Sequence, residues 1–435
     1  MQAYNKVVIT IGNMTRANRF LKIFNIADGV TRQFYNDELE NVEIIEQITD
    51  NNQALNINEA SLRILPKITT GVLFQRTLPF SIYRNNELYG KFYIDKSIAN
   101  TDQTLYDITV SDYIKILEAQ TYLGGLYNNI TVANLIADIL GEIPYTLDAT
   151  LGTYTISGYL PILTKREALR QVAFITNAYI DTSRADTIII NPLPTTISAT
   201  KTTADIINIE TTQENITTKI ELNTQQLTTK NAETDEIFNG ALSGNKMIVF
   251  DAPKFDLSIT GGTIVSSNIN YAIISGTGAN VVLSGKTYEQ YVSVASKTNA
   301  YTVSTDIEKI DDYNTTLICN DVSTIDALNF VEYKIKSIFK MGTVKVGDLI
   351  SLNGQTCRVM QLSYDLKQTN IYANAELEAY YETTQLRSLA KGRAVEEEWY
   401  FGADYDYSRL EKEDKKEEIK DEKKEEEPKD EKQVR

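Results

Sequence analysis

The sequence predicts a multi-domain, mainly β protein with α+β parts. The chain has 435 residues, which is enough for two to four domains that each bury a core. Ile, Thr, Asn and Tyr recur along it, and it holds 26 Tyr but only 8 Pro. Because β-branched and aromatic side chains favour half-buried strands and Pro interrupts them, this composition is typical of a β-rich chain.

Residues 1–100 are predicted to form a first β domain. Short apolar stretches bounded by polar turns are typical of strands, and four of them occur at residues 7–11, 42–48, 62–65 and 88–94. Just beyond, Tyr106, Ile108 and Val110 alternate with polar residues. This period of two indicates a further half-buried strand.

Residues 101–195 are predicted to form a small α/β domain. Helices are expected over 111–119 and 129–141, and the second has an apolar face made of Val132, Leu135, Ile136, Ile139 and Leu140. Thr164 and Glu167 have the spacing of a capping box, in which each side chain satisfies a helix N–H group. Two strands, over 177–182 and 187–191, follow that helix.

Residues 196–322 are predicted to form a β-rich domain. Apolar stretches of strand length, at 247–250, 281–283 and 291–294, lie between turns that contain glycine.

Residues 323–385 are predicted to be a helix followed by a β-hairpin module. Ser323 starts the helix and Gly342 ends it, with an apolar face formed by Ile325, Leu328, Val331, Ile335 and Ile338. The pair Asn353-Gly354, between apolar runs at 349–352 and 356–360, is the strongest short hairpin signal in the chain. Residues 371–382 then alternate between apolar and polar, as a strand with one solvated face does.

Residues 386–435 are predicted to be a charged and largely disordered tail. After Leu410 the chain is almost purely Lys, Glu and Asp, which cannot bury enough apolar surface to offset the entropy of ordering. From Leu410 to Arg435 there are 12 acidic and 9 basic residues, so −13 of the net charge of −16 belongs to residues 1–409. A chain of that sign repels a phosphate backbone, so sequence-specific nucleic-acid binding is not expected.

The composition argues against an enzyme. The chain has no His, which removes the commonest general base and metal ligand, and its two Cys, Cys319 and Cys357, have no zinc-site spacing. Phosphate loops, dinucleotide fingerprints and nucleophile elbows are absent from the sequence. We therefore predict no catalytic, cofactor-binding or metal-binding residue.

One enzymatic alternative needs only carboxylates, as in glycosidases and aspartic proteases. Acidic residues cluster in two places: Glu233, Asp235 and Glu236, and Asp306, Glu308, Asp311 and Asp312. Clustering along a loop does not place two carboxylates in one pocket, so this stays the third hypothesis.

Four stretches together resemble the tail or baseplate hub proteins of phages and of phage-like contractile bacteriocins of Gram-positive bacteria, which are related to the phage late control D group. The stretches are the strand-to-helix step over 90–119, residues 156–174 with 181–186, residues 267–271 with 283–288, and residues 345–348 with the Asn353-Gly354 turn. The second stretch is the most specific, and together they span most of residues 90–382.

The resemblance implies an architecture and partners. In that family two tube-type, β-barrel-like domains per chain form a ring as a trimer, with pseudo-sixfold symmetry. One face of the ring meets the tail tube protein and the other meets the spike. Residues 1–100 and the module over 323–385 would supply the two tube-type domains, with the small α/β domain between them. The expected partners are other copies of the chain, the tube protein, and the spike or other baseplate proteins.

The same resemblance places the protein in the tail of a virion or phage-like particle, assembled in the bacterial cytoplasm. No signal peptide and no apolar run of about 18 residues are seen in the sequence, so no membrane span is expected. The alternative function is a receptor- or glycan-binding β-rich tail or surface protein, for which the dispersed Tyr residues and the pairs Tyr380-Tyr381 and Tyr400-Phe401 are candidate contacts.

Overall fold

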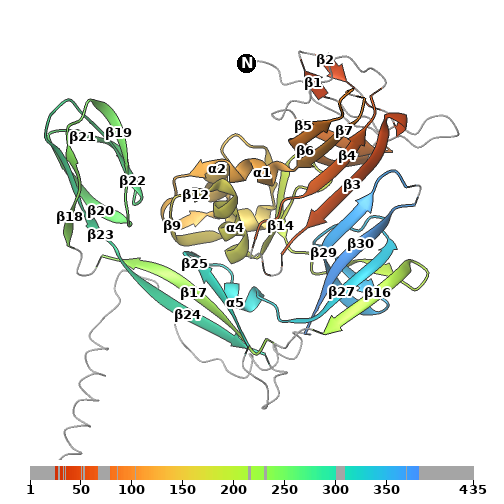
Figure 1. The fold of residues 1–435 in the computed structure, drawn as a ribbon. Coiled ribbons are helices and arrows are strands. Elements are labelled where there is room, and N and C mark those ends of the chain that lie inside the picture. The colour runs from red at the N-terminus through yellow and green to blue at the C-terminus, as the bar shows by residue number, and fades with distance from the viewer. Residues whose placement is uncertain are drawn as a thin grey trace, which may run out of the picture. The chain divides into compact units, whose positions relative to one another are not determined.

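A computed structural model describes residues 25–27, 30–32, 34, 36–49, 51, 54–66, 79–85, 87–102, 104–213, 217–229, 233–299, 309–368 and 370–381. The chain divides into two units, Met1–Tyr381 and Glu382–Arg435, and every described residue lies in the first. The predicted strand at 7–11, the predicted disordered tail over 386–435 and the pair Tyr400-Phe401 therefore lie outside the described residues. The described part is mainly β, with several sheets and a few short helices, as predicted (Figure 1).

The largest sheet has 11 strands and joins the two ends of the described chain. Its main path runs through β16 (Ile206–Gln213), β27 (Val331–Lys340), β30 (Tyr372–Tyr380), β29 (Gln355–Asp365), β3 (Leu39–Gln47), β4 (Glu59–Ile64), β7 (Tyr106–Ser111), β6 (Glu87–Ala99) and β5 (Pro79–Arg84). Off this path, β28 (Leu349–Leu352) pairs with β29 and with the parallel strand β15 (Ile197–Lys201). We call these 11 strands the main sheet.

The two halves of the main sheet meet where β29 pairs with β3 in antiparallel register, from Gln361 opposite Gln47 to Asp365 opposite Glu43. Alternation along β3 places Val42 and Ile44 in the core. One hydrophobic core runs under both halves and includes Ile44, Ile108, Phe339 and Leu362. The strands predicted at 42–48, 62–65, 88–94 and 106–110 are confirmed, with boundaries shifted by a few residues.

The predicted helix over 323–342 is wrong. The structure has only the short α5 (Thr324–Ala327), which ends at Leu328 in an extended conformation, and residues Val331–Lys340 form strand β27. Ile335, Ser337 and Phe339 are buried, while Lys334, Lys336 and Lys340 on the other face are exposed. Apolar residues three and four apart favoured a helix, but pairing with β16 and β30 on both sides buries the alternating face instead.

The hairpin predicted at Asn353-Gly354 is confirmed. It joins β28 to β29, and both turn residues have positive φ, 49° and 88°. Those angles are what a two-residue type I′ hairpin requires.

The α/β part predicted around residues 101–195 has a second core. Its helices are α1 (Tyr113–Glu118), α2 (Val132–Leu140), α3 (Ala149–Thr153) and α4 (Lys165–Thr176). Its strands are β8 (Thr121–Tyr122), β9 (Gly125–Thr131), β10 (Tyr145–Leu147), β11 (Thr155–Leu160), β12 (Leu163–Thr164), β13 (Ala178–Asp181), β14 (Ile188–Pro192) and β26 (Leu317–Cys319).

Most local signals in this part are confirmed, and the capping box is confirmed for the Thr164 side chain only. All five residues of the predicted apolar face of α2 are buried, and Gly141 ends that helix with φ 63°. The Thr164 hydroxyl accepts from the N–H of Glu167 and caps α4, whereas the Glu167 carboxylate accepts from Arg170. The predicted strand pair is β13 with β14, in antiparallel register.

The β-rich region contains two further substructures. The first, which we call the arm, is the sheet β24 (Glu289–Thr298), β17 (Lys219–Thr228) and β25 (Ile310–Thr315). The second has a small core of its own between two three-stranded sheets. These are β18 (Thr234–Gly240), β23 (Val281–Thr287) and β20 (Lys254–Thr260), and β19 (Gly244–Val249), β22 (Tyr271–Gly276) and β21 (Thr263–Ser267). The strands predicted at 247–250, 281–283 and 291–294 are confirmed in β19, β23 and β24.

The short elements β1 (Asn25–Ala27), β2 (Val30–Arg32) and η1 (Asn36–Glu38) precede β3. No helix among the described residues is both long and apolar enough to cross a membrane.

Candidate assembly surfaces and the buried polar junction

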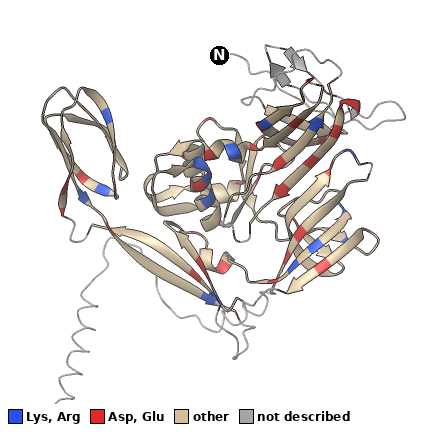
Figure 2. Cartoon of the chain, in the orientation of Figure 1, with Lys and Arg blue, Asp and Glu red and all other residues tan. Residues whose placement is uncertain are grey.

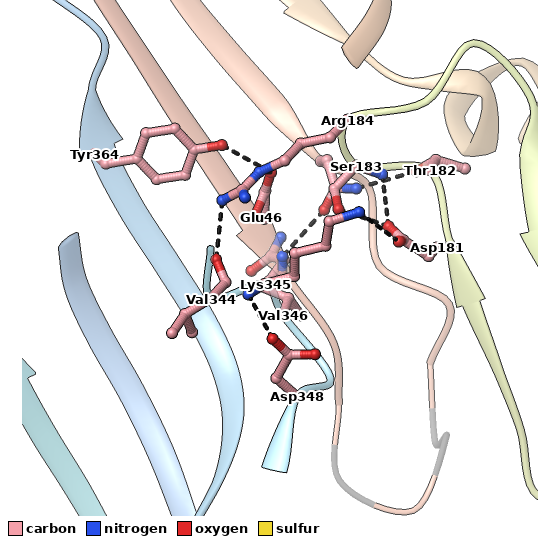
Figure 3. A network of polar contacts seen from close by, with 12 residues as sticks. Glu46, Asp181, Thr182, Ser183, Arg184, Val344, Lys345, Val346, Asp348 and Tyr364 are labelled. Atoms are coloured by element: carbon pink, nitrogen blue, oxygen red, sulfur yellow. Dashed lines mark hydrogen bonds and ion pairs between the residues drawn. The ribbon is translucent and has the colours of Figure 1, made fainter. Parts of the chain in front are cut away.

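A buried polar cluster ties the two halves of the main sheet to the loop that follows β13. It contains Glu46 of β3, Tyr364 of β29 and Arg184 of the loop (Figure 3). The Tyr364 hydroxyl donates to Glu46 Oε1 at 2.7 Å, and Arg184 Nε lies 3.8 Å from the same oxygen. Arg184 also donates to the carbonyl of Val344 at 2.9 Å. We call this set the polar junction.

The junction is almost dry. The side chains of Arg184 and Glu46 are 4% and 1% exposed. The guanidinium lies against two aromatic rings, 5.3 Å from the centroid of Tyr89 and 6.0 Å from that of Tyr364. Arg184 has φ 50°, a left-handed conformation that its surroundings must hold in place. Such a desolvated ion pair fixes one relative geometry of the elements it joins more than it adds to stability.

Carboxyl groups continue this cluster toward α1. Asp112 caps α1 by accepting from the N–H of Ile114 at 3.0 Å, and its other oxygen accepts from the Asn58 N–H and the Thr182 hydroxyl. Asp181, at the end of β13, accepts from the Ser183 hydroxyl and lies 4.0 Å from the Lys345 ammonium.

Burial raises the pKa of each of these three carboxyl groups. It raises the pKa of Glu46 above its ordinary value, and the charge of Arg184 acts against that rise. It raises the pKa of Asp112 to about 6, although three hydrogen bonds favour the charged form. It also raises the pKa of Asp181. These groups hold protein elements together.

The sequence analysis did not find this junction, although one signal points to it. Glu46 has the same parity as the core residues Val42 and Ile44, so a charge falls on the buried face of β3. Residues 181–186 were singled out only as part of the family resemblance, and residues 183–186 were otherwise expected to connect two strands. Its contacts with Val344 and Glu46 join segments more than a hundred residues apart, which periodicity cannot reveal.

Several of the described acids considered for hydrolysis have structural partners, among them Glu236, which accepts from the Asn239 amide at 3.2 Å. Asp311 accepts from the Thr217 hydroxyl at 2.8 Å, and Asp235 pairs with Lys254 at 2.8 Å. Asp312 lines an open cavity of about 280 Å³ beside the Glu167–Arg170 pair. Asp306 and Glu308 lie outside the described residues. Among the described residues there is no group of three or more His, Cys, Asp or Glu placed to hold a metal ion.

The other candidate residues from the sequence are buried or have contacts within the chain. Cys319 and Cys357 are both buried free thiols. Tyr380 donates to Glu378 at 3.0 Å, and Tyr381 packs against the core of the α/β part.

The candidate assembly surfaces are strand edges. β16 and β5 end the main sheet, and within the described residues each pairs with one strand only. Nearly every residue of β16 is exposed, including Ile207 at 64% and Ile209 at 40%. An exposed edge with apolar side chains presents unpaired backbone groups to another strand.

Comparison with known proteins gives structural similarity without sequence similarity. No protein-family model matches the chain, and no curated protein sequence matches it. The structure is similar to the 43 kDa tail protein of a Shewanella oneidensis prophage, with 11% identity and a TM-score of 0.46, covering 81% of this chain and 96% of that one.

Two further tail proteins have the same TM-score of 0.46 and 8% identity. One is the prophage tail protein gp18 of Listeria monocytogenes, where 83% of this chain and 94% of that chain are covered. The other is a tail protein of Neisseria meningitidis, with 82% and 95% covered. All three are described as tail proteins.

Proposed function

We propose that this chain is the structural hub of a phage-like tail baseplate, a ring-forming oligomer that joins the tail tube to the central spike. The observation that carries the proposal is the main sheet. Its path from β16 to β5 is antiparallel at every step and open at both ends, within the described residues. A protein with this sheet is built to continue it into a neighbour.

The edge at β16 favours a partner strand over solvent. Monomeric proteins usually protect an edge strand with Lys, Pro or inward-pointing charge. β16 has neither Lys nor Pro, and Glu210 is its one charged residue. Its exposed Ile207 and Ile209 would lose contact with water on pairing, at about 25 cal/mol for each Å² of apolar surface buried.

The two end strands of the main sheet, β16 and β5, can form a head-to-tail contact between copies. If β16 of one copy lies beside β5 of the next, the contact is head-to-tail, and repetition of a head-to-tail contact generates a ring when the rotation closes. Three copies follow from the resemblance to hub proteins, in which two tube-type domains per chain present six similar units to the tube. Strands β3 to β7 and β27 to β30 are the two sheet halves that would supply them.

The charge suits a passage for a polyanion. Residues 1–409 carry −13, so a ring built from them would repel a phosphate backbone and let it slide. In this function the chain acts by geometry and performs no catalysis, and its place is the tail of the particle.

The test compares the double variant Ile207→Lys/Ile209→Lys with Val265→Lys, which changes an exposed apolar residue of β21, outside the main sheet. We expect light scattering to show loss of the oligomer for the double variant only, because lysines on the edge oppose strand pairing. An oligomer of unchanged mass in the double variant would refute the edge as the ring contact.

A further inference from the structure

The arm contains a second open edge. β24 pairs with β17 along all ten residues, from Thr298 opposite Lys219 to Glu289 opposite Thr228, without a register shift. On the other side of β17 lies β25. In the described part of the chain no strand pairs with the outer edge of β24.

The middle of β24 lacks the features that protect an edge. From Gln290 to Ser296 there is no charged residue and no Pro, and Figure 2 shows this stretch without charge. Val292 and Val294 are 55% and 57% exposed. A regular, uncharged strand with β-branched side chains is a template for another extended strand.

The two charges of β24 stand at equal distances from its middle. Glu289 lies four residues before Ser293, and Lys297 lies four residues after it. The Lys297 ammonium donates to the carbonyl oxygens of Asp326 and Leu328, at 3.0 and 2.9 Å. Among the described residues neither Glu289 nor Lys297 has an ion-pair partner.

We propose that β24 pairs in antiparallel register with β24 of a second copy, centred on Ser293. This register sets Val292 against Val294 of the second copy and sets Glu289 against Lys297 of the second copy. Glu289, Ser293 and Lys297 share one face of the strand, because side chains alternate with a period of two. The two contacts repeat by symmetry, as a twofold interface requires.

The charge pattern of β24 favours a second copy of this chain over a strand of another protein. Two chains of net charge −16 repel each other, so they associate best along an uncharged seam with opposite charges at its ends, which β24 provides. Exposed ion pairs contribute little energy, so the Glu289–Lys297 pairs set the register while the backbone ladder and the valines hold the strands.

This contact is separate from the ring contact of the proposed function. The β16–β5 contact is head-to-tail, whereas the β24 contact is a twofold contact between two chains. Either contact can fail while the other holds, and variants in the arm leave both edges of the main sheet unchanged.

The first experiment uses cysteine crosslinking. In the proposed register Ser293 faces itself, and opposite residues in antiparallel strands have Cα atoms about 4.5–5.5 Å apart, which a disulfide can span. Ser293→Cys is therefore expected to double its mass on a non-reducing gel after oxidation. Cys319 and Cys357 are buried and give little background.

The control is Ser296→Cys, whose two copies would be six residues out of register, about 20 Å apart, and should stay uncrosslinked. The double variant Gln290→Cys/Ser296→Cys should crosslink again, because this register sets Gln290 opposite Ser296 of the second copy. Crosslinking of Ser296→Cys as readily as Ser293→Cys would overturn the register.

A second experiment tests whether the two exposed valines hold the contact. Val292→Lys/Val294→Lys should abolish dimer formation by Ser293→Cys, with far-UV circular dichroism unchanged because both valines are exposed. Two results would overturn the proposal: no Ser293→Cys dimer at any protein concentration, or protection of β24 from hydrogen exchange only when a different protein of the particle is added.

Discussion

Replacing Arg184 with Met is expected to weaken the polar junction strongly at neutral pH. The substitution keeps a long apolar side chain against Tyr89 and Tyr364 but removes the guanidinium near Glu46. The Glu46 side chain is 1% exposed, so its carboxylate would remain buried with the Tyr364 hydroxyl as its hydrogen-bond donor. Breaking a buried pair by removing one partner costs about 3–5 kcal/mol.

The loss should shrink as the pH falls. Burial raises the pKa of Glu46, so the native state holds the proton more tightly than the unfolded state does. The stability contributed by such a group is full below its unfolded pKa of about 4.5 and is lost as the pH rises through the folded pKa. Without Arg184 the folded pKa rises further, so the deficit of Arg184→Met is largest near pH 7 and smallest near pH 4.5.

The assay is hydrogen exchange on peptides from β3 and β29, which reports local opening free energies where a multi-domain chain has no single unfolding transition. Glu46→Gln removes the carboxylate and keeps an acceptor for the Tyr364 hydroxyl. It is therefore the second single variant of a double-mutant cycle with Arg184→Met. We expect Arg184→Met to cost far less in the Glu46→Gln background. Equal costs in both backgrounds, or a deficit independent of pH, would refute the role given to this pair.

Three other changes test neighbouring parts of the account. Burial raises the pKa of Asp112 to about 6, so the wild type should lose roughly 2–3 kcal/mol of stability as the pH rises from 3.8 to about 6. Asp112→Asn has no carboxyl group to titrate and should not show this loss. Denaturation measurements in which both proteins change in parallel with pH would contradict this. Gly124→Ala should destabilise far more than Gly354→Ala in chemical denaturation, because both have positive φ but a Cβ at Gly124 would lie 2.1 Å from the carbonyl oxygen of Leu160, whereas a Cβ at Gly354 meets nothing within 4 Å. Thr164→Ala should cost about 1 kcal/mol by removing the cap of α4, and retention of the cap by Thr164→Ser is the control.

Local patterns predicted much of the fold. The alternation in β7, the apolar face of α2, and the Asn353-Gly354 turn each depend on neighbours in sequence, and the structure confirms them. β27 shows the limit of such patterns. Its residues 331, 335 and 338 fit a helical spacing, while Ile335 and Phe339 also fit an alternating one, and only pairing with two distant strands decides between them.

The polar junction and the sheet that contains it depend on contacts that no local pattern encodes. Glu46 and Tyr364 are 318 residues apart in sequence and 2.7 Å apart in space. The pairing of β3 with β29 sets that contact, and it also turns two sets of predicted strands into one sheet. Sequence spacing predicted the strands but not which of them would be left as edges.

The central claim is that this chain forms a ring. The most direct measurement is the solution mass of the full chain by light scattering, with negative-stain images of the same peak. The account predicts three times the monomer mass, or six times where arms pair, and ring-shaped particles with an open centre. A monomer at every concentration, or a compact particle without an opening, would contradict it.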